Sequence, residues 1–368
     1  MGVLILLVLT SCAESESIIF PYIIAGANGY PLLKYSTKSC TISTLCTDVY
    51  CEHLSSGKAY EVCEFAVSTG YPVVGNGGIY YTRQSEPDKR MTYDLKYYDY
   101  ANGSIRLISK RDYLTGLFWH DGSLYWWEHF FNSDSDQTKA GSHLYRYDEK
   151  TGRITQLTDK SNYYESESAP WLGFPTLIYA DDDSLYYLAY PELYRSDKQL
   201  EQIETITLAE LDIPKETVLP YGNGYLHNGW QYRMTENEIC ALERQNVKTG
   251  EIEVIAEQIV CFVMDETAVY LQPYYTENTE TKSVGGVSRT NRSKGQILRY
   301  DLKTGETTEL LNDPTLHLEE KLYLQDSVLM VRMYGTVVDP MDGTKCYDVL
   351  PHALFFKNGE WRKVEYDG

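Results

Sequence analysis

Beyond residue 12, the sequence lacks any hydrophobic run long enough for a membrane-spanning helix, which needs about 20 apolar residues. It also lacks the short motifs of common enzyme classes: no Gly-x-Ser-x-Gly, His-Glu-x-x-His, P-loop or Gly-x-Gly-x-x-Gly pattern is present. Histidine is scarce, with 7 copies, and no two of them have the spacing of a metalloenzyme motif. These absences predict that the chain is not an enzyme, and we nominate no catalytic residue.

Basic residues are few relative to acidic ones, with 33 Lys and Arg against 53 Asp and Glu and a net charge of −20 at pH 7. Nucleic acid is therefore excluded as a partner, because nucleic-acid affinity comes largely from basic residues that neutralise phosphates. The acidic residues are spread without a long block of one sign, which indicates a solvated surface. Hydrophobic residues make up 43% of the chain, enough for a core, and the 34 tyrosines favour strands.

Helical periodicity is also weak, and its best candidate, Leu208 to Leu211, reads as a short turn. What the sequence does contain is an internal repeat of about fifty residues. Leu144 to Leu157 reads as strand, turn and strand, with alternating apolar residues on both sides of a Thr-Gly turn. Copies of this outer hairpin begin at Leu95, Leu193, Leu242, Ile297 and Leu354.

A second motif, a turn followed by an apolar or aromatic pair, precedes each outer hairpin and predicts an inner one. Its copies are 77–81, 121–126, 183–187, 223–226, 266–270 and 320–323. Two hairpins make a four-stranded antiparallel unit, and radial repetition of such units gives a β-propeller. A further hairpin within 18–46 predicts seven blades, with six as the fallback, and an array of β-sandwiches is the structural rival.

The N-terminus reads as an export signal. Residues 1–11 are mainly apolar, and Leu9-Thr10-Ser11-Cys12 resembles a bacterial lipobox, in which the cysteine is acylated. Basic residues are missing before the apolar run, so we expect the true start to lie upstream; an ordinary buried strand is the alternative. We predict a signal peptide over 1–11, a short tether over 12–17 and a propeller over 18–368, with the protein anchored through Cys12 at the extracytoplasmic face of the cell membrane.

The propeller topology predicts that function lies on one face. The turns within hairpins are short, whereas the connections between hairpins and between blades are long and emerge together on the opposite face. The second strands bring aromatic and polar side chains to that face, where they could bind a protein, peptide or glycan; inter-blade packing is the alternative role. The speculative ligand-binding residues are Arg83, Trp127, His129, Trp230, Tyr232, Tyr274, Arg332 and Tyr334.

An insert at 40–65 contains four of the 8 cysteines. Cys46, Cys51, His53 and Cys63 form a C-x4-C-x-H-x9-C array, and three thiolates with an imidazole suit structural zinc. A disulfide, or a set of reduced thiols, would explain the same residues. In each case the expected role is to pin the exit from the first blade.

Taken together, the lipobox, the Tyr-Asp-x-x-Thr-Gly turns and the array from Cys46 to Cys63 resemble TolB-like propeller lipoproteins of clostridial and related Gram-positive bacteria. The resemblance implies a secreted, membrane-anchored propeller with a binding role. We therefore expect a non-catalytic cell-envelope lipoprotein that acts as a binding module through its long-loop face. The alternative is a glycan-active hydrolase or lyase that uses the axial cup.

Overall fold

A computed structural model describes the strands and most of the turns of this chain. The described residues are 17–20, 33–36, 41–46, 64–65, 72–84, 92–111, 113–131, 140–158, 176–189, 192–199, 201–236, 240–274, 280–284, 287–291, 295–325, 327–338 and 345–365. Within them the regular structure is all β, apart from the short 3-10 helix η1 (Leu208–Glu210). No helix among these residues is long and apolar enough to cross a membrane.

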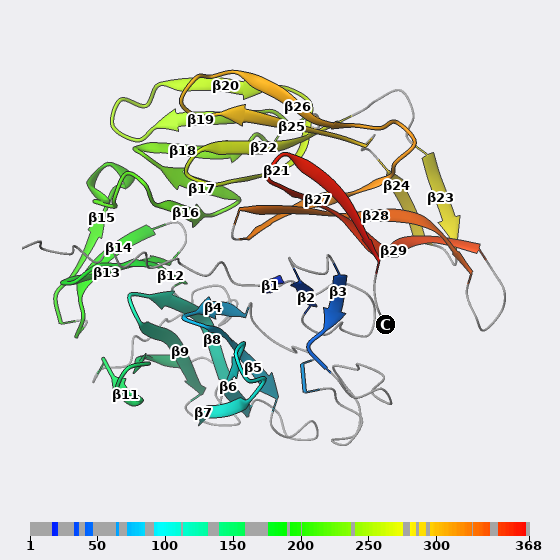
Figure 1. The fold of residues 1–368 in the computed structure, drawn as a ribbon. Coiled ribbons are helices and arrows are strands. Elements are labelled where there is room, and N and C mark those ends of the chain that lie inside the picture. The colour runs from blue at the N-terminus through cyan, green and yellow to red at the C-terminus, as the bar shows by residue number, and fades with distance from the viewer. Residues whose placement is uncertain are drawn as a thin grey trace, which may run out of the picture.

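Successive antiparallel sheets are arranged in a ring, as the sequence predicted (Figure 1). The first three are β4(Val73–Gly75), β5(Gly78–Gln84), β6(Tyr93–Asp99), β7(Ile105–Arg111); β8(Tyr113–His120), β9(Ser123–Phe131), β10(Ala140–Asp148), β11(Arg153–Gln156); and β12(Thr176–Ala180), β13(Ser184–Ala189), β14(Glu192–Asp197), β15(Ile203–Ile206). In each of these sheets the strands follow one another in chain order. The protein is therefore a β-propeller with four-stranded antiparallel blades.

The later sheets vary this plan. They are β16(Val218–Tyr221), β17(Gly224–His227), β18(Trp230–Met234), β19(Leu242–Asn246), β20(Ile252–Ala256); β21(Ile259–Met264), β22(Ala268–Pro273), β25(Gln296–Asp301), β26(Thr307–Asn312); and β27(Leu318–Gln325), β28(Val328–Val338), β29(Lys345–Lys357), β30(Glu360–Glu365). A separate hairpin, β23(Glu280–Val284) and β24(Val287–Asn291), lies inside the connection from 276 to 295 that was expected to be a loop.

The small sheet β1(Ser17–Phe20), β2(Leu33–Ser36) and β3(Thr41–Thr44) lies where the sequence predicted a seventh blade. Strand β1 contacts β27 and β3 contacts β30, both of the last sheet. Leu45, the next residue along the chain, packs on Ile79 and Tyr81 of the first four-stranded sheet. The small sheet thus lies between the last and the first blade (Figure 1).

Three of the outer hairpins, in the described part of the chain, have turns that share one hydrogen-bond pattern. In the hairpin that begins at Ile297, the side chain of Asp301 accepts bonds from the backbone amides of Lys303 and Thr304, at 3.0 and 2.9 Å. The amide of Gly305 then donates to the Asp301 carbonyl at 2.9 Å, with a left-handed φ of 73° that glycine adopts without strain. Asp148 and Asn246 accept from their turns in the same way. The Asp-x-x-Thr-Gly signal is therefore a turn with a defined mechanism.

Two of the six predicted inner turns differ from expectation. Residues 320–321 lie inside strand β27, which pairs with β28 up to Gln325 and Val328. The pair Asn223-Gly224 adjoins a hairpin turn as predicted, because Tyr221 pairs with Gly224 across 222–223, but this turn joins β16 to β17. Gly224 is a buried strand residue, where a Cβ atom would lie 1.9 Å from the Tyr232 carbonyl oxygen. The inner turn of this blade is Asn228-Gly229, both with left-handed φ, so β16 is a fifth strand that the sequence analysis missed.

A recurring backbone bond identifies the true inner turn. In three other blades, the residue that follows the third strand donates its amide to the inner turn: Tyr100 to Gly77, Glu149 to Gly122 and Leu302 to Thr267, at 2.9 to 3.0 Å. Here Val247 donates to Gly229 at 3.0 Å. Strands β17 to β20 are therefore equivalent to the four strands of an ordinary blade, and β16 is added at the sheet edge beyond β17.

The core lies between the sheets. On β9 the fully buried Trp126 packs among residues of the preceding sheet, whereas Trp127 packs among residues of the following one. Consecutive residues of a strand point to opposite faces, so both faces of this sheet are covered. Tyr80 and Tyr81 on β5 divide in the same way.

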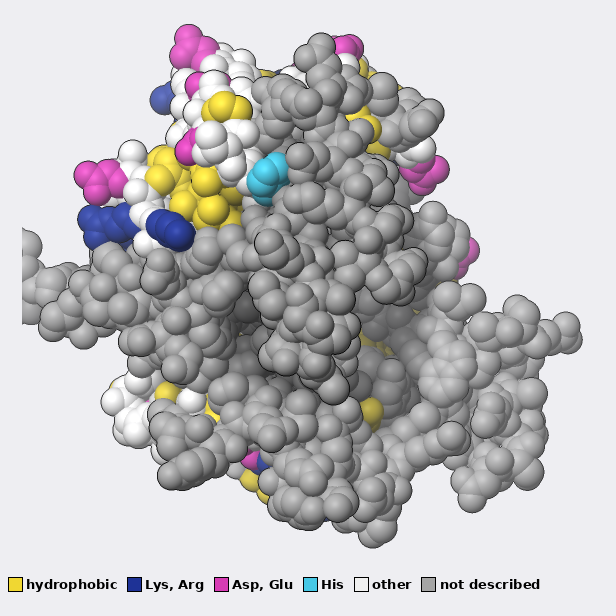
Figure 2. Space-filling model, turned by 90° about the vertical axis from the view of Figure 1, so that its right-hand side faces the viewer, with side chains coloured by type: hydrophobic (Ala, Val, Ile, Leu, Met, Phe, Trp, Pro, Cys, Tyr) yellow, Lys and Arg dark blue, Asp and Glu magenta, His cyan; other side chains and the backbone are white. Residues whose placement is uncertain are grey.

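Exposed apolar side chains are concentrated on the outermost strands, where each sheet ends. They are Ile105, Leu107, Ile203, Ile252 and Val254. Figure 2 shows one face of the molecule, with a group of hydrophobic side chains bordered by Lys and Arg, and with acidic side chains scattered rather than gathered. This scatter agrees with the dispersed acidic charge in the sequence.

The turn chemistry predicts an acid-dependent step in stability. Bonds from the Thr304 backbone and from Arg299 lower the pKa of Asp301 from 3.8 to about 2. Because the folded-state pKa is depressed, this stabilisation is present above about pH 4 and is lost as the pH falls toward 2. Asp301→Asn keeps the acceptor, as Asn246 does naturally, so we expect a shallower fall in the free energy of unfolding between pH 4 and 2, measured by urea denaturation. Asp182→Asn, at an exposed turn position, is the control and should keep the wild-type slope.

Candidate functional site

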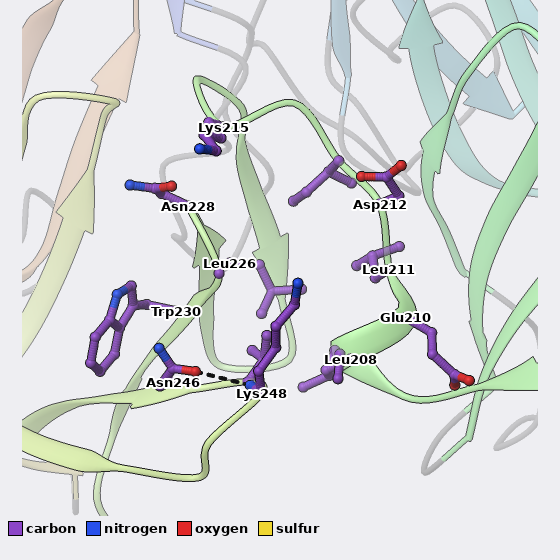
Figure 3. A pocket seen from close by; sticks show the side chains of 14 residues that line it. Leu208, Glu210, Leu211, Asp212, Lys215, Leu226, Asn228, Trp230, Asn246 and Lys248 are labelled. Atoms are coloured by element: carbon purple, nitrogen blue, oxygen red, sulfur yellow. Dashed lines mark hydrogen bonds between the residues drawn. The ribbon is translucent and has the colours of Figure 1, made fainter.

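A pocket of about 490 Å³ lies where the connection from β15 to β16 passes the turns of the next blade (Figure 3). The connection contributes residues 208–213 and Lys215, and the blade contributes Leu226, 228–230 and 246–248. Pockets that hold small ligands typically measure about 300 to 1,000 Å³. This pocket is large enough for a ligand or for a few residues of a partner chain.

The added strand explains why these elements meet. Strand direction alternates in an antiparallel sheet, so one additional strand reverses every strand that follows it. The inner turn at 228–229 and the outer turn at 247–250 therefore lie at the end of the blade where the connection arrives. We predicted connections and tight turns on opposite faces, and here β16 brings them together.

The connection is held in place by local hydrogen bonds. Thr207 donates its backbone amide and its hydroxyl to the Glu210 carboxylate, at 2.8 and 2.9 Å, which fixes the first turn of η1. The Thr217 amide bonds the Pro214 carbonyl at 2.9 Å, and the Thr217 carbonyl lies 3.1 Å from the ring nitrogen Nδ1 of His227. Hydrogen bonds thus hold both ends of the connection, which forms one wall of the pocket.

The pocket has an apolar floor and a polar rim. Leu226 is buried, and the other apolar side chains are half-buried in the cluster between β12–β15 and β16–β20; they are Leu208, Leu211, Ile213 and Val247. The rim carries exposed polar and charged side chains: Glu210, Asp212, Lys215, Asn228 and Lys248. An apolar floor with a polar rim suits a ligand that has both kinds of group.

Two rim residues are oriented by bonds inside their own blade. The Asn246 side-chain oxygen accepts from the amides of Lys248 and Thr249 at 3.0 Å each, which leaves its amide nitrogen as a donor on the side of Trp230 (Figure 3). The Arg244 guanidinium lies 4.5 Å from the centre of the Trp230 ring and is itself bonded to Glu253. These contacts order the edge of the pocket before any ligand binds.

Among the predicted ligand-binding residues, three are buried between sheets. Trp127, Tyr232 and Arg332 are 0%, 2% and 4% exposed. Trp127 meets Tyr187 edge to face, and the Tyr232 ring packs with the cluster between β16–β20 and β21–β26. Trp127 and Tyr232 thus take part in the packing between blades that was the alternative interpretation.

Arg332 forms a buried ion pair. Its guanidinium donates two hydrogen bonds to Glu319, and the Tyr323 hydroxyl donates to the same carboxylate at 3.3 Å. Burial, together with the Glu319 charge, raises the pKa of Tyr323 above its ordinary value, so its hydroxyl stays protonated. The predicted cationic ligand contact is therefore a structural pair that joins β27 to β28.

The remaining predicted residues are dispersed. Arg83 and Lys96 both bond Glu64, with the Lys96 distance at 2.7 Å. Tyr274 is partly buried at the end of β22, and Trp230 alone lines the pocket. His129 and Tyr334 lie in β9 and β28, and their side chains lie outside the described part of the chain.

The cysteine and histidine array is described at one of its four positions. Cys46 packs beside Leu45, and Phe65, two residues after Cys63, belongs to the same cluster on β5. Cys46 and Phe65 thus both pack on the first four-stranded blade, and the pinning role of the array stays a prediction. Cys12, Cys51, His53 and Cys63 lie outside the described residues, so zinc, disulfide and reduced thiols remain the alternatives.

The pocket was not predicted, because the repeat pattern places the inner turn of this blade at Asn223-Gly224. Asn228-Gly229 is itself a strong hairpin signal, and five residues earlier Asn223-Gly224 carries the same one. Each pair lies at the end of a strand. Two such signals in one blade were the available evidence for an extra strand.

No family model and no curated protein matches the chain. Solved structures of similar fold include an oligogalacturonate lyase in complex with manganese, at 10% identity over 91% of this chain and 85% of that one, with a TM-score of 0.43. The β-propeller domain of the Trilobed protease from Pyrococcus furiosus matches at 10% over 80% and 82%, with a TM-score of 0.42. TolB from Acinetobacter baumannii matches at 12% over 96% and 83%, with a TM-score of 0.34. The likeness concerns the TolB-like propeller fold alone.

These comparisons correct one expectation. We predicted that the chain is not an enzyme, and this is contradicted because the similar structures include oligogalacturonate lyase, acylaminoacyl peptidase and puromycin hydrolase. The motifs that the sequence lacks do not represent every enzyme class, so their absence does not exclude catalysis. Neither binding nor catalysis follows from the fold.

The Arg332 pair yields a stability prediction. Replacing Arg332 by Met leaves Glu319 as a buried, uncompensated carboxylate, which we expect to lower the free energy of unfolding by about 3 to 5 kcal/mol. The double variant Arg332→Met/Glu319→Met removes both charges and should recover most of that loss. Urea denaturation at pH 7 measures both; equal losses in the single and double variants would show that the pair is not the cause.

Proposed function

We propose that the protein is a lipid-anchored, extracytoplasmic β-propeller that binds a ligand in the pocket between β15 and β20. The lipobox-like segment ending at Cys12 supports the anchor, which places the propeller outside the membrane. The observation that carries the binding role is the pocket itself, with an apolar floor and a rim already ordered by Asn246, Arg244 and Glu253. A site ordered in advance loses less conformational freedom when it binds.

The anchor predicts a simple fractionation result. When the full chain is expressed in a Gram-positive host with radiolabelled palmitate, we expect label and protein together in the membrane fraction. Cys12→Ala should remove the label and release the protein, because the thiol that carries the diacylglycerol is gone. Cys240→Ala, a cysteine far along the chain, is the matched control and should remain labelled. Label retained by Cys12→Ala contradicts the anchor.

The binding role predicts that filling the pocket abolishes binding. Ala209 lines the pocket, and Ala209→Trp places an indole in it. Ala101→Trp adds the same ring at an exposed turn of the first four-stranded blade. In ligand-observed NMR with a chemically diverse fragment set, we expect fragments that bind the wild type and Ala101→Trp but not Ala209→Trp. If no fragment of any class is lost in Ala209→Trp, the pocket is not the binding site.

A further inference from the structure

Two lysines, Lys215 and Lys248, line the pocket. Most of the arginines whose side chains the structure describes are paired with a carboxylate, including Arg195 with Glu204, Arg233 with Glu243 and Arg244 with Glu253. Lys215 and Lys248, by contrast, form no ion pair with any described residue. In a chain with a net charge of −20, two unpaired ammonium groups therefore flank one apolar cavity.

The two acidic side chains of the rim do not neutralise these lysines. Glu210 is held by Thr207, and its carboxylate points away from the centre of the pocket (Figure 3). Asp212 forms no ion pair with any residue that the structure describes. The Lys248 ammonium group, on the other hand, extends above Leu226, toward the middle of the pocket. The cavity thus has an apolar floor with positive charge above it.

We propose that this pocket binds an amphipathic carboxylate, with its apolar group on Leu208, Leu211 and Leu226 and its carboxylate toward Lys215 and Lys248. This inference rests on the proposed binding function and names the chemical class of the ligand. Burial of the apolar group supplies most of the affinity, at roughly 25 cal/mol for each Å² removed from water. The lysines add selectivity for the anion, since an exposed charge pair contributes modestly and is screened by salt.

The repeat provides a matched control for this charge. Lys248 follows Asn246 and Val247 in the outer turn of its blade, and Lys303 holds the same position in the turn of 301–305. Both lysines are exposed, and Lys303 does not line the pocket. A difference between Lys248→Gln and Lys303→Gln therefore reports the pocket and not the turn.

The test measures binding to the full chain in detergent and, for comparison, to the purified propeller, residues 13–368. Four probes are used. Octanoate and N-acetyl-L-leucine are carboxylates from two sources, a fatty acid and a peptide C-terminus; 1-octanol and N-acetyl-L-leucinamide are their neutral counterparts. Titration calorimetry should show at least one carboxylate binding more tightly than its neutral counterpart, and more weakly as salt is raised. The tighter carboxylate identifies the source.

Substitutions then locate the interaction. We expect Lys248→Gln to weaken carboxylate binding about three- to fivefold, and Lys215→Gln/Lys248→Gln about tenfold or more, with Lys303→Gln unchanged. Asp212→Asn should strengthen it, because one competing negative charge is removed. Thermal unfolding checks that each variant is folded.

Three results would overturn the inference: neutral probes that bind as tightly as carboxylates, equal effects of Lys248→Gln and Lys303→Gln, or glycan fragments as the sole ligands lost in Ala209→Trp. In each of these the pocket still binds something, so the proposed function survives. If Ala209→Trp changes the binding of no fragment, the proposed function fails as well. The two failures are thereby distinguishable.

Discussion

The architecture depends on one packing constraint: each sheet has two apolar faces, and both must be covered. Trp126 and Trp127 are neighbours on β9, fully buried, and they belong to the clusters on opposite sides of their sheet. Tyr186 and Tyr187 on β13 divide in the same manner. A sheet with one apolar face could form a two-layer sandwich, whereas sheets with two apolar faces need a neighbour on each side. A ring of sheets satisfies that need without leaving a terminal face exposed.

The polar groups in this core are few and are matched with one another. Glu319, Arg332 and Tyr323 form one buried group, and Tyr80 donates to Glu149 at 2.8 Å between the first two four-stranded blades. Because an unpaired buried charge is costly, such groups are tolerated where their partners are fixed by the sheet. They join strands or blades, and several of the residues that looked suited to ligand contact serve this purpose instead.

The pocket is a consequence of breaking the repeat. Strand β16 adds one strand to the fourth of the six larger blades, and the turns of that blade then lie beside the incoming connection. Its lining comes from a connection tied down by Thr207, Glu210 and Pro214 and from turns tied down by Asn246. A binding site that is built from such ordered pieces is typical of loops held on a rigid scaffold.

The sequence by itself determined the class of fold and the outer hairpins. Each outer turn is a local structure, in which Asp148, Asn246 or Asp301 bonds the amides that follow it, so the signal is complete within five residues. Tertiary contacts determine that Asn228-Gly229, and not Asn223-Gly224, is the inner turn of its blade. These contacts are the bond from Val247 to Gly229 and the close approach of Gly224 to Tyr232. Burial was decided in the same way: Trp127, Tyr232 and Arg332 looked like ligand contacts in sequence, and the neighbouring sheet covers them. Hydrogen bonds within a turn can be predicted from the sequence, because they join residues that are close along the chain. The direction of a strand and the face of a sheet that the next sheet covers are set only when the sheets pack together.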